Sequence, residues 1–237
     1  MVIIKPESAQ MAKYAANAYL AQRITFINQI ANLCEKNGAD VQEVIAAIGF
    51  DQRIGSHYWY PGIQYGGSCF PKDVKELAAY SRAIGEGDGL FVKIDQLNDA
   101  RPAKLVQKWD QQIKFSGKTV AVLGLSFKPN TSDIREAPAL KIIPILQEAG
   151  ATIRAYDPQA MDESRRFYTK VQFASSILDV ARHADVLMLL VEWDEFKSLD
   201  FNKLKQVMKG HIFIDTRNQY QPADVAKHGF TYIGIGR

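Results

Sequence analysis

The chain has 237 residues, of which 47% are hydrophobic and 23% are charged, and its formal net charge is +3. This composition is typical of a globular protein with enough length for two modest domains. Such a slight charge, without a block of Lys and Arg residues, gives no support to nucleic acid or membrane binding. The two cysteines lack metal-ligand spacing, which excludes a disulfide framework and a zinc cluster. We therefore expect reduced thiols, a cytoplasmic location and no metal.

The first half of the chain has a helical pattern. Residues that favour a helix start and a helix stop bound the segments Pro6–Asn37 and Asp40–Gly49. A later helix is predicted over about Asp88–Lys114, interrupted or kinked at Pro102 because proline removes a backbone hydrogen bond. Between them, Phe50–Ser68 carries Gly, Pro and five aromatic residues but no clear period. A loop of that length in a compact domain is usually functional.

The segment GGSCFPKD, at residues 66–73, is the most informative part of the sequence. Pro71 suits the first turn of a helix, so the segment places Cys69 at a helix start. Unpaired backbone N–H groups there favour a thiolate, and Lys72 adds a nearby cation. Asp73 lies four residues after the thiol, where a proton acceptor could orient a water. These residues favour a reactive cysteine over a buried structural one.

After Gly117 the pattern changes to alternating strands and helices. Such alternation with apolar strands predicts a parallel sheet covered on both faces, with ligands beyond the carboxyl ends of the strands. We therefore expect a helical domain at residues 1–115 and an α/β domain at residues 116–237. The predicted elements, in chain order, are strand Thr119–Leu123, helix Pro138–Ala149, strand Thr152–Tyr156, helix Ser175–Ala184, strand Val186–Val191, helix Phe201–Met208, strand Ile212–Asp215, helix Ala223–His228 and strand Thr231–Ile235.

Two cations are predicted to lie at the ligand edge of this sheet. Lys128 follows the first strand and Arg217 follows Ile212–Asp215, a placement that suits a diphosphate. The turn after the first strand is not GxGxxG, so the dinucleotide fingerprint is absent. Asp157 ends the second strand, where a carboxylate could bind a ribose, but a plain turn residue is the favoured interpretation.

Several motifs, in their order and spacing, resemble the UDP-glucose/GDP-mannose dehydrogenase family, and most closely its UDP-glucose 6-dehydrogenase branch. The resemblance spans essentially the whole chain, and the cysteine segment with the Lys13–Asn17 pair is its most specific part. The motifs are Lys13-Tyr14-Ala15-Ala16-Asn17, Phe26-Ile27-Asn28, Arg53-Ile54-Gly55, Pro61-Gly62, the cysteine segment itself, Phe127-Lys128-Pro129-Asn130-Thr131 and Asp133-Ile134-Arg135-Glu136.

The resemblance implies an NAD-dependent, four-electron oxidation of UDP-glucose to UDP-glucuronate. Cys69 would attack the intermediate aldehyde to form a thiohemiacetal, which is then oxidised to a thioester and hydrolysed. Lys13 and Asn17 would stabilise the charge on the sugar oxygen, and Asp73 would assist proton transfer. Taken alone, a Lys–Asn pair four residues apart on a helix is more typical of a solvated surface.

The resemblance also implies which residues bind the two ligands. Arg53 would reach the sugar site of the neighbouring subunit in a homodimer. The residues implied for the nucleotide sugar are Lys13, Asn17, Arg53, Tyr60, Ile63, Tyr65, Gly66, Phe127, Lys128 and Arg217, and those implied for NAD are Cys69, Lys72 and Arg135.

The sequence departs from the family pattern in two respects. The family loop usually reads Pro-Gly-x-Gly-aromatic-Gly-Gly, but Gln64 stands here in place of the second glycine. The family's N-terminal NAD-binding domain has no counterpart in the chain, so we expect a fragment that is inactive alone. Two alternatives stay open. One is a GDP-mannose 6-dehydrogenase or another nucleotide-sugar dehydrogenase, and the other is a non-catalytic nucleotide-sugar-binding and dimerisation module.

Overall fold

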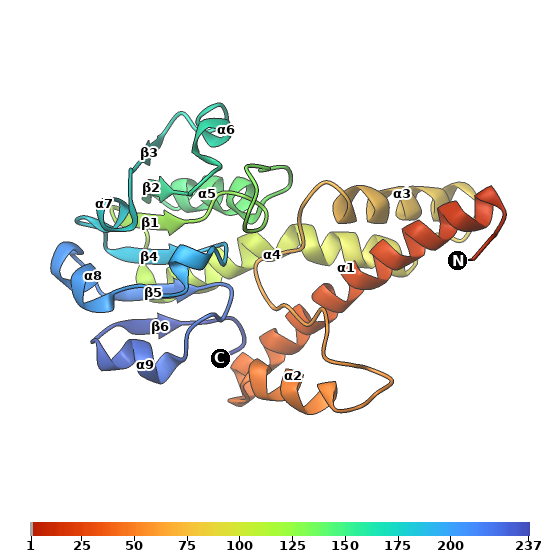
Figure 1. Cartoon of the computed structure of the whole chain (residues 1–237), viewed down its shortest axis with the longest axis horizontal. Coiled ribbons are helices and arrows are strands. Elements are labelled where there is room, and N and C mark those ends of the chain that lie inside the picture. Colours follow the sequence, from red (N-terminus) through yellow and green to blue (C-terminus); the bar gives the residue numbers. More distant parts are fainter. Residues whose placement is uncertain (1) are drawn as a thin grey trace.

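The computed structural model of the protein describes residues 2–237 and combines a helical region with an α/β region (Figure 1). The expected α plus α/β fold is therefore confirmed. No helix within residues 2–237 is long and apolar enough to cross a membrane. The helical region consists of α1 (Pro6–Asn37), α2 (Val41–Gly49), α3 (Phe70–Ala83) and α4 (Leu90–Ile113).

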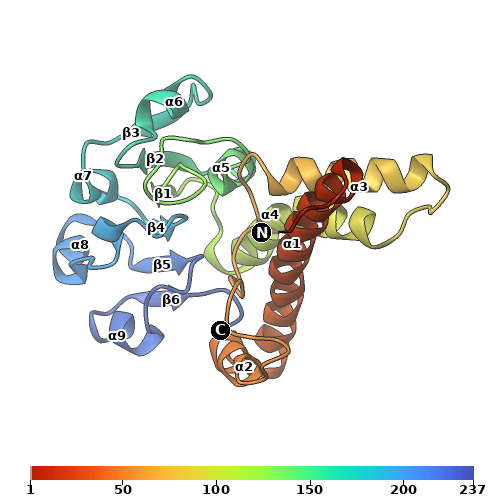
Figure 2. The ribbon, with the colours of Figure 1, turned by 45° about the vertical axis from the view of Figure 1, so that its right-hand side comes forward.

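Helix α1 is 32 residues long, and its two ends follow the local sequence signals. Pro6 occupies the first turn, where the missing N–H has no partner to lose. Gly38 ends the helix with a positive φ of 80°, and its N–H bonds to the Cys34 carbonyl. Helices α2, α3 and α4 all contact α1. Figures 1 and 2 both place α3 beside its N-terminal part and α2 beside its C-terminal part.

The short helices α2 and α3 begin where the sequence predicts. The Asp40 carboxylate caps α2 by accepting the Gln42 N–H at 2.7 Å. Cys69 is the N-cap residue of α3, and Pro71 lies in its first turn. The segment between the two helices, all of it described, contains turns and bends but no helix or strand. The predicted loop is thus confirmed.

Helix α4 continues through Pro102 as a single element, so the prediction of an interruption there is wrong. A proline inside a helix costs about 3 kcal/mol. Burial of one face along the whole helix offsets this cost, because each buried aliphatic side chain contributes about 1.5–3 kcal/mol. Val92, Leu105, Val106 and Trp109 are among the α4 side chains that are 5% exposed or less.

The α/β region contains one sheet of six parallel strands in the order β3-β2-β1-β4-β5-β6. This is the strand order of dinucleotide-binding Rossmann folds. The central strands β1 and β4 are almost entirely buried, as expected for a parallel sheet covered on both faces. The strands are β1 (Thr119–Leu123), β2 (Thr152–Tyr156), β3 (Val171–Phe173), β4 (Val186–Leu189), β5 (Ile212–Asp215) and β6 (Thr231–Ile233).

The helices of the α/β region are short, and the sequence pattern missed some elements. Strand β3 and helix α6 were not predicted, because elements of three and five residues carry too little periodicity. The 3-10 helix η1 was missed for the same reason. The helices are α5 (Pro138–Glu148), α6 (Met161–Arg165), α7 (Ile177–Ala181), η1 (Asp194–Phe196), α8 (Phe201–Val207) and α9 (Pro222–Lys227).

One hydrophobic core joins the sheet to the long helices. Ile27 of α1 and Trp109 of α4 belong to the same buried cluster as Val122 and Leu187 of the sheet. A second, smaller cluster lies between α1, α3 and α4 and includes Tyr65 of the loop before Cys69. The loop that leads to Cys69 is therefore anchored in buried packing that connects to both regions.

Candidate active site

Cys69 is the exposed cysteine of the chain, whereas Cys34 is buried. Its thiol lies at the start of α3, 3.8 Å from the Ser68 hydroxyl oxygen. The two preceding glycines pack tightly against the α/β region. A Cβ on Gly67, whose φ is +79°, would lie 2.9 Å from the Phe127 ring. The backbone at this point thus needs glycine to bring Cys69 beside the α/β region.

Three side chains from two helices converge on the buried carboxylate of Asp73. The amide of Asn17 donates to Asp73 Oδ2 at 2.6 Å. The ammonium of Lys13 lies 3.4 Å from the same oxygen, and Lys72 pairs with Oδ1. Because Lys13 and Asn17 are one turn apart on α1, both reach the carboxylate from the same face. The predicted group of Lys13, Asn17, Lys72 and Asp73 is assembled one helical turn from Cys69.

The electrostatics of this group favour an ionised carboxylate. Burial raises the pKa of Asp73, but hydrogen bonds from Lys72 and Asn17, together with the Lys13 charge, hold that pKa below its ordinary value. The pKa of Lys72 is raised, chiefly by its hydrogen bond to Asp73 and also by the charge of Cys69. The site therefore fixes one amide donor and two cations on the Asp73 carboxylate, and one of these cations, Lys72, lies within electrostatic range of the thiol.

The loop before Cys69 is held by buried polar side chains that the sequence did not reveal. Asn98 of α4 bonds to both backbone groups of Tyr65, accepting its N–H at 2.9 Å and donating to its carbonyl at 3.2 Å. The guanidinium of Arg101 donates to the Gly62 carbonyl at 2.7 Å, and Asn28 accepts the Gly62 N–H at 2.9 Å. Asn28 belongs to the motif Phe26-Ile27-Asn28, but no motif marks Asn98 or Arg101, because their role depends on how α1 and α4 pack.

The same loop reaches the ligand edge of the sheet. A Cβ on Gly62 would lie 3.2 Å from Arg217 Nη1, so Arg217 is next to the loop. The Arg217 guanidinium donates to both oxygens of Glu192 at 2.7 and 2.9 Å. The ammonium of Lys128 lies 5.3 Å from the centre of the Phe127 ring. The structure thus brings Phe127, Lys128 and Arg217 to the edge that faces the cysteine loop.

The other predicted loop residues differ in their exposure. Ile63 and Tyr65 are both 2% exposed and belong to the two hydrophobic cores, while Gly66 is half-buried. Tyr60 is 51% exposed. A side chain of Ile63 or Tyr65 cannot reach a ligand from these positions, so any contact there involves the backbone. Of these predicted loop residues, Tyr60 presents an exposed aromatic side chain, whose ring packs against Tyr58 at 5.6 Å between centres.

Gln64 is buried despite its polar side chain. Its amide nitrogen donates to the Glu136 carbonyl at 3.4 Å, and its amide oxygen has no partner. This weak contact joins the cysteine loop to the α/β region at the same carbonyl that Gly66 faces. Gln64 does not have a positive φ, so its backbone conformation is one that a residue with a side chain adopts without strain.

Arg53 and Arg135 are tied to neighbouring carboxylates. Arg53 pairs with Asp51 at 2.6 Å on an exposed turn after α2, and the structure does not bring it to the group around Asp73. Arg135 pairs with Asp133 at 2.7 Å. The pKa of Arg135 is raised, chiefly by Asp133 and also by the charge of Cys69. Arg135 therefore lies within electrostatic range of the thiol.

Asp157 is fully occupied by contacts within the protein. One of its oxygens accepts the N–H groups of Leu125 at 2.7 Å and Ser126 at 3.1 Å, and the Trp193 indole N–H at 3.2 Å. The other accepts two backbone N–H groups of its own turn at 2.9 and 2.7 Å. This saturation leaves no acceptor for a ribose hydroxyl, as expected for a turn residue.

Comparison with known proteins identifies the family. Residues 7–100 match the family model described as the UDP-glucose/GDP-mannose dehydrogenase family, central domain, and residues 121–222 match the UDP binding domain of the same family. The chain belongs to this family. The resemblance seen in the sequence is thereby confirmed.

Individual relatives agree with this assignment. A UDP-glucose 6-dehydrogenase of Rhizobium meliloti is 43% identical, a match that covers 100% of the chain and 55% of the relative. A solved UDP-glucose dehydrogenase from Pyrobaculum islandicum is 30% identical with a TM-score of 0.87, covering 99% of the chain and 52% of that protein. A GDP-mannose dehydrogenase from Pseudomonas aeruginosa is 26% identical with a TM-score of 0.57, covering 97% and 53%. The chain spans about half the length of these relatives.

Proposed function

We propose that the chain is part of an NAD-dependent enzyme that oxidises UDP-glucose to UDP-glucuronate, with Cys69 as the nucleophile. The observation that carries the proposal is the convergence of Lys13, Asn17 and Lys72 on buried Asp73, next to the exposed thiol. Hydrogen-bond donors fixed beside a nucleophile are the arrangement that addition to a carbonyl needs. The higher structural similarity to the UDP-glucose enzyme than to the GDP-mannose enzyme supports a UDP sugar, and the 43% identity to the Rhizobium meliloti enzyme supports glucose as the sugar.

In this proposal Cys69 forms a carbon–sulfur bond to the sugar aldehyde. The carbonyl π electrons move to oxygen, and the Asn17 amide and the Lys13 ammonium stabilise the resulting oxyanion. Asp73 holds both donors in place, and its lowered pKa keeps it ionised at neutral pH. A carboxylate of low pKa is a weak base, so in hydrolysis of the thioester we assign to Asp73 the orientation of the attacking water.

The residues present fit one wall of an NAD site. Cys69, Lys72 and Arg135 would face the cofactor, because the two cations are exposed and lie near the thiol. The sheet edge itself does not fit a dinucleotide, because the Asp157 carboxylate is saturated. When bound, NAD supplies a hydride acceptor. We propose that this chain alone does not reduce NAD.

The sheet edge fits the diphosphate of a nucleotide sugar. Lys128 and Arg217 supply the charges, and the backbone of the loop from Tyr60 to Gly66 faces them. Binding would require Arg217 to exchange Glu192 for a phosphate, a bidentate partner of the same kind. Calorimetric titration of this chain with UDP, UDP-glucose and GDP tests the assignment. Equal affinity for GDP and UDP would contradict it.

The nucleophile is tested on this chain without a cofactor. UDP-glucose 6-aldehyde should protect Cys69 from alkylation by iodoacetamide, because the thiol is consumed in the thiohemiacetal. Asn17→Ala should weaken this protection by about 10- to 100-fold while UDP binding stays within about twofold, because the lost donor acts on the oxyanion. Unchanged alkylation in the presence of the aldehyde would reject Cys69 as the nucleophile.

We also propose that the helical region forms a twofold dimer through α1. Tyr19, Phe26 and Leu33 are 55%, 50% and 58% exposed and repeat every seven residues along the helix, which places them on one face. Exposed apolar rows of this kind mark interaction surfaces. Light scattering at tens of micromolar tests the proposal, and the triple substitution of these residues by Gln is the matched variant. A wild-type chain that is monomeric there would refute it.

A further inference from the structure

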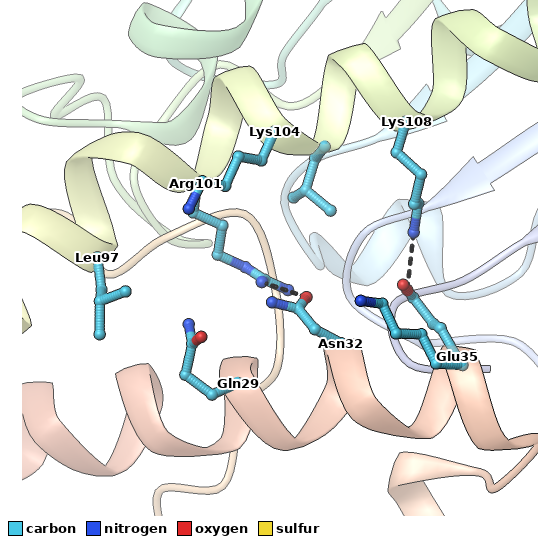
Figure 3. Close-up of a pocket in the computed structure, with 9 residues that line it drawn as sticks. Gln29, Asn32, Glu35, Leu97, Arg101, Lys104 and Lys108 are labelled. Carbon is cyan, nitrogen blue, oxygen red and sulfur yellow. Dashed lines mark hydrogen bonds and ion pairs between the residues drawn. The ribbon is translucent and has the colours of Figure 1, made fainter.

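A cavity of about 400 Å³ lies between α1 and α4, away from the residues assigned above to catalysis. Figure 3 shows Arg101, Lys104 and Lys108 on α4, with Arg101 facing Asn32 and Lys108 facing Glu35 of α1. Lys36 also lines the cavity, so four cations and a single carboxylate surround it. A concave surface lined mainly by one sign of charge concentrates ions of the opposite sign.

Arg101 is the least exposed cation of the cavity, with 4% of its surface accessible. Three of its donor contacts are satisfied: Nε by the Gly62 carbonyl, and Nη1 by Asn32 at 2.8 Å and by the Asn28 carbonyl at 3.2 Å. Its Nη2 is buried without any hydrogen-bond partner. Burial lowers the pKa of Arg101 to about 10, so the group stays charged at neutral pH. An unpaired buried guanidinium N–H is unfavourable, and an anion would pair it.

The lysines leave positive charge unbalanced around Arg101. Lys108 pairs with Glu35 at 2.8 Å. Lys36 and Lys104 are exposed, and neither forms an ion pair within the described residues. The guanidinium and these two lysines line the same cavity, and the carboxylate that lines it, Glu35, already pairs with Lys108.

We propose that this cavity binds a small phosphorylated metabolite, with Arg101, Lys104 and Lys36 as the phosphate ligands. Nη2 of the guanidinium is the donor that remains for a phosphate oxygen, and the lysines supply point charges. A phosphate monoester carries close to two negative charges, which suits the unbalanced lining better than a single carboxylate does. The amides of Gln29 and Asn32 line the same space and can bond to hydroxyl groups of the metabolite.

The bound anion would act on the loop before Cys69 through a shared side chain. Arg101 holds the Gly62 carbonyl at 2.7 Å, and Gly62 lies beside Arg217 at the sheet edge. An anion that binds the same guanidinium changes the strength and geometry of the hydrogen bond between Arg101 and the Gly62 carbonyl. We therefore expect occupancy of the cavity to change the affinity for UDP, a step that rests on the proposed function of that loop.

The site is tested by calorimetric titration of the whole chain with inorganic phosphate and pyrophosphate at constant ionic strength. We expect one pyrophosphate at the cavity, beside any that the sheet edge binds through Arg217. Binding at the cavity should weaken by about tenfold or more in the double variant Lys36→Gln/Lys104→Gln, because two charged contacts are lost. Both lysines are exposed, so the variant should fold. The matched control Lys93→Gln/Lys205→Gln removes equal charge from exposed positions outside the cavity and should bind normally.

A third variant separates the cavity from the sheet edge. Arg217→Gln should leave pyrophosphate binding at the cavity within about twofold of wild type, because Arg217 is not part of the cavity. No binding isotherm, an isotherm unaffected by Lys36→Gln/Lys104→Gln, or one abolished by Arg217→Gln would each overturn the proposal.

The coupling is measured by titrating UDP with and without saturating inorganic phosphate, because pyrophosphate would also compete with the UDP diphosphate at the sheet edge. We expect UDP affinity to change by about fivefold or more in wild type, with no such change in Lys36→Gln/Lys104→Gln, since typical coupling between two sites is about fivefold or larger. An unchanged UDP affinity would overturn the coupling and leave the binding site standing. If UDP fails to bind at all, the proposed function fails, while the pyrophosphate titration still decides the cavity.

Discussion

Replacement of Gly66 by alanine should separate the cysteine loop from the α/β region. A Cβ at this position would lie 2.2 Å from the Glu136 carbonyl oxygen and 3.2 Å from the Glu136 carbonyl carbon. Both contacts involve backbone, so no side-chain rotation relieves them. Ordinary contact distance requires a shift of roughly 1 Å, and overpacking of this size costs about 1–3 kcal/mol.

The cost is measured by thermal and urea unfolding. At about 2–4 °C per kcal/mol for a chain of this length, the melting temperature of Gly66→Ala should fall by about 2–12 °C. UDP-glucose affinity should fall as well, because the retreating loop carries the residues that face Arg217. Gly49→Ala is the matched control, since its new Cβ would meet only Ser56 at 3.5 Å, an ordinary contact. If Gly66→Ala unfolded at the wild-type temperature, the close approach of loop and Glu136 would not exist.

Three further outcomes are expected. The pKa of Asp73 is lowered in the folded protein, so its ionised form stabilises the fold above the unfolded-state pKa of 3.8. The stability difference between wild type and Asp73→Asn should therefore shrink as pH falls below about 4. A difference that is constant from about pH 5 to pH 3 would contradict the assignment. Asn98→Ala should cost about 2–4 kcal/mol in urea unfolding, because both backbone groups of Tyr65 lose a buried partner. In the native chain a thiol reagent should label Cys69 rapidly and buried Cys34 only on unfolding, with Cys69→Ser as the control; equal rates at the two thiols would show that the cysteine loop is differently exposed.

Local signals in the sequence were sufficient for most of the fold. Helix α1 begins and ends at the predicted Pro6 and Asn37, and three strands match their predicted bounds, because caps, glycine stops and apolar runs act over a few residues. Strand β3 escaped detection because its three residues pair with β2 only in the folded sheet. The uninterrupted α4 depends on burial of Pro102, which local propensity does not include.

The candidate site was predictable only in part. The group around Asp73 follows from the motif and from the helical spacing of Lys13 and Asn17. The residues that position the loop do not follow from the sequence, because Asn98 and Arg101 bond to backbone groups that are 33 and 39 residues away along the chain. A buried asparagine on a helix gives no signal in sequence for which backbone it will bind. The cations of the cavity likewise give no signal in the sequence, because they come together only when α1 and α4 pack side by side.

Because α4 is uninterrupted, a tilt at its C-terminal end also displaces its N-terminal part. Its C-terminal part is fixed in the core of the sheet, and Asn98, farther along the same helix, holds the loop that leads to Cys69. The distance from Asn98 to Ile113 along the axis is about 22 Å at 1.5 Å per residue. A tilt of about 3° at the sheet end would therefore move the loop by roughly 1 Å, a displacement that can cost about 100-fold in rate at a reacting centre. Substitutions where α4 packs against the sheet, far from the thiol, are thus able to lower the rate of the reaction proposed for Cys69 without unfolding the protein.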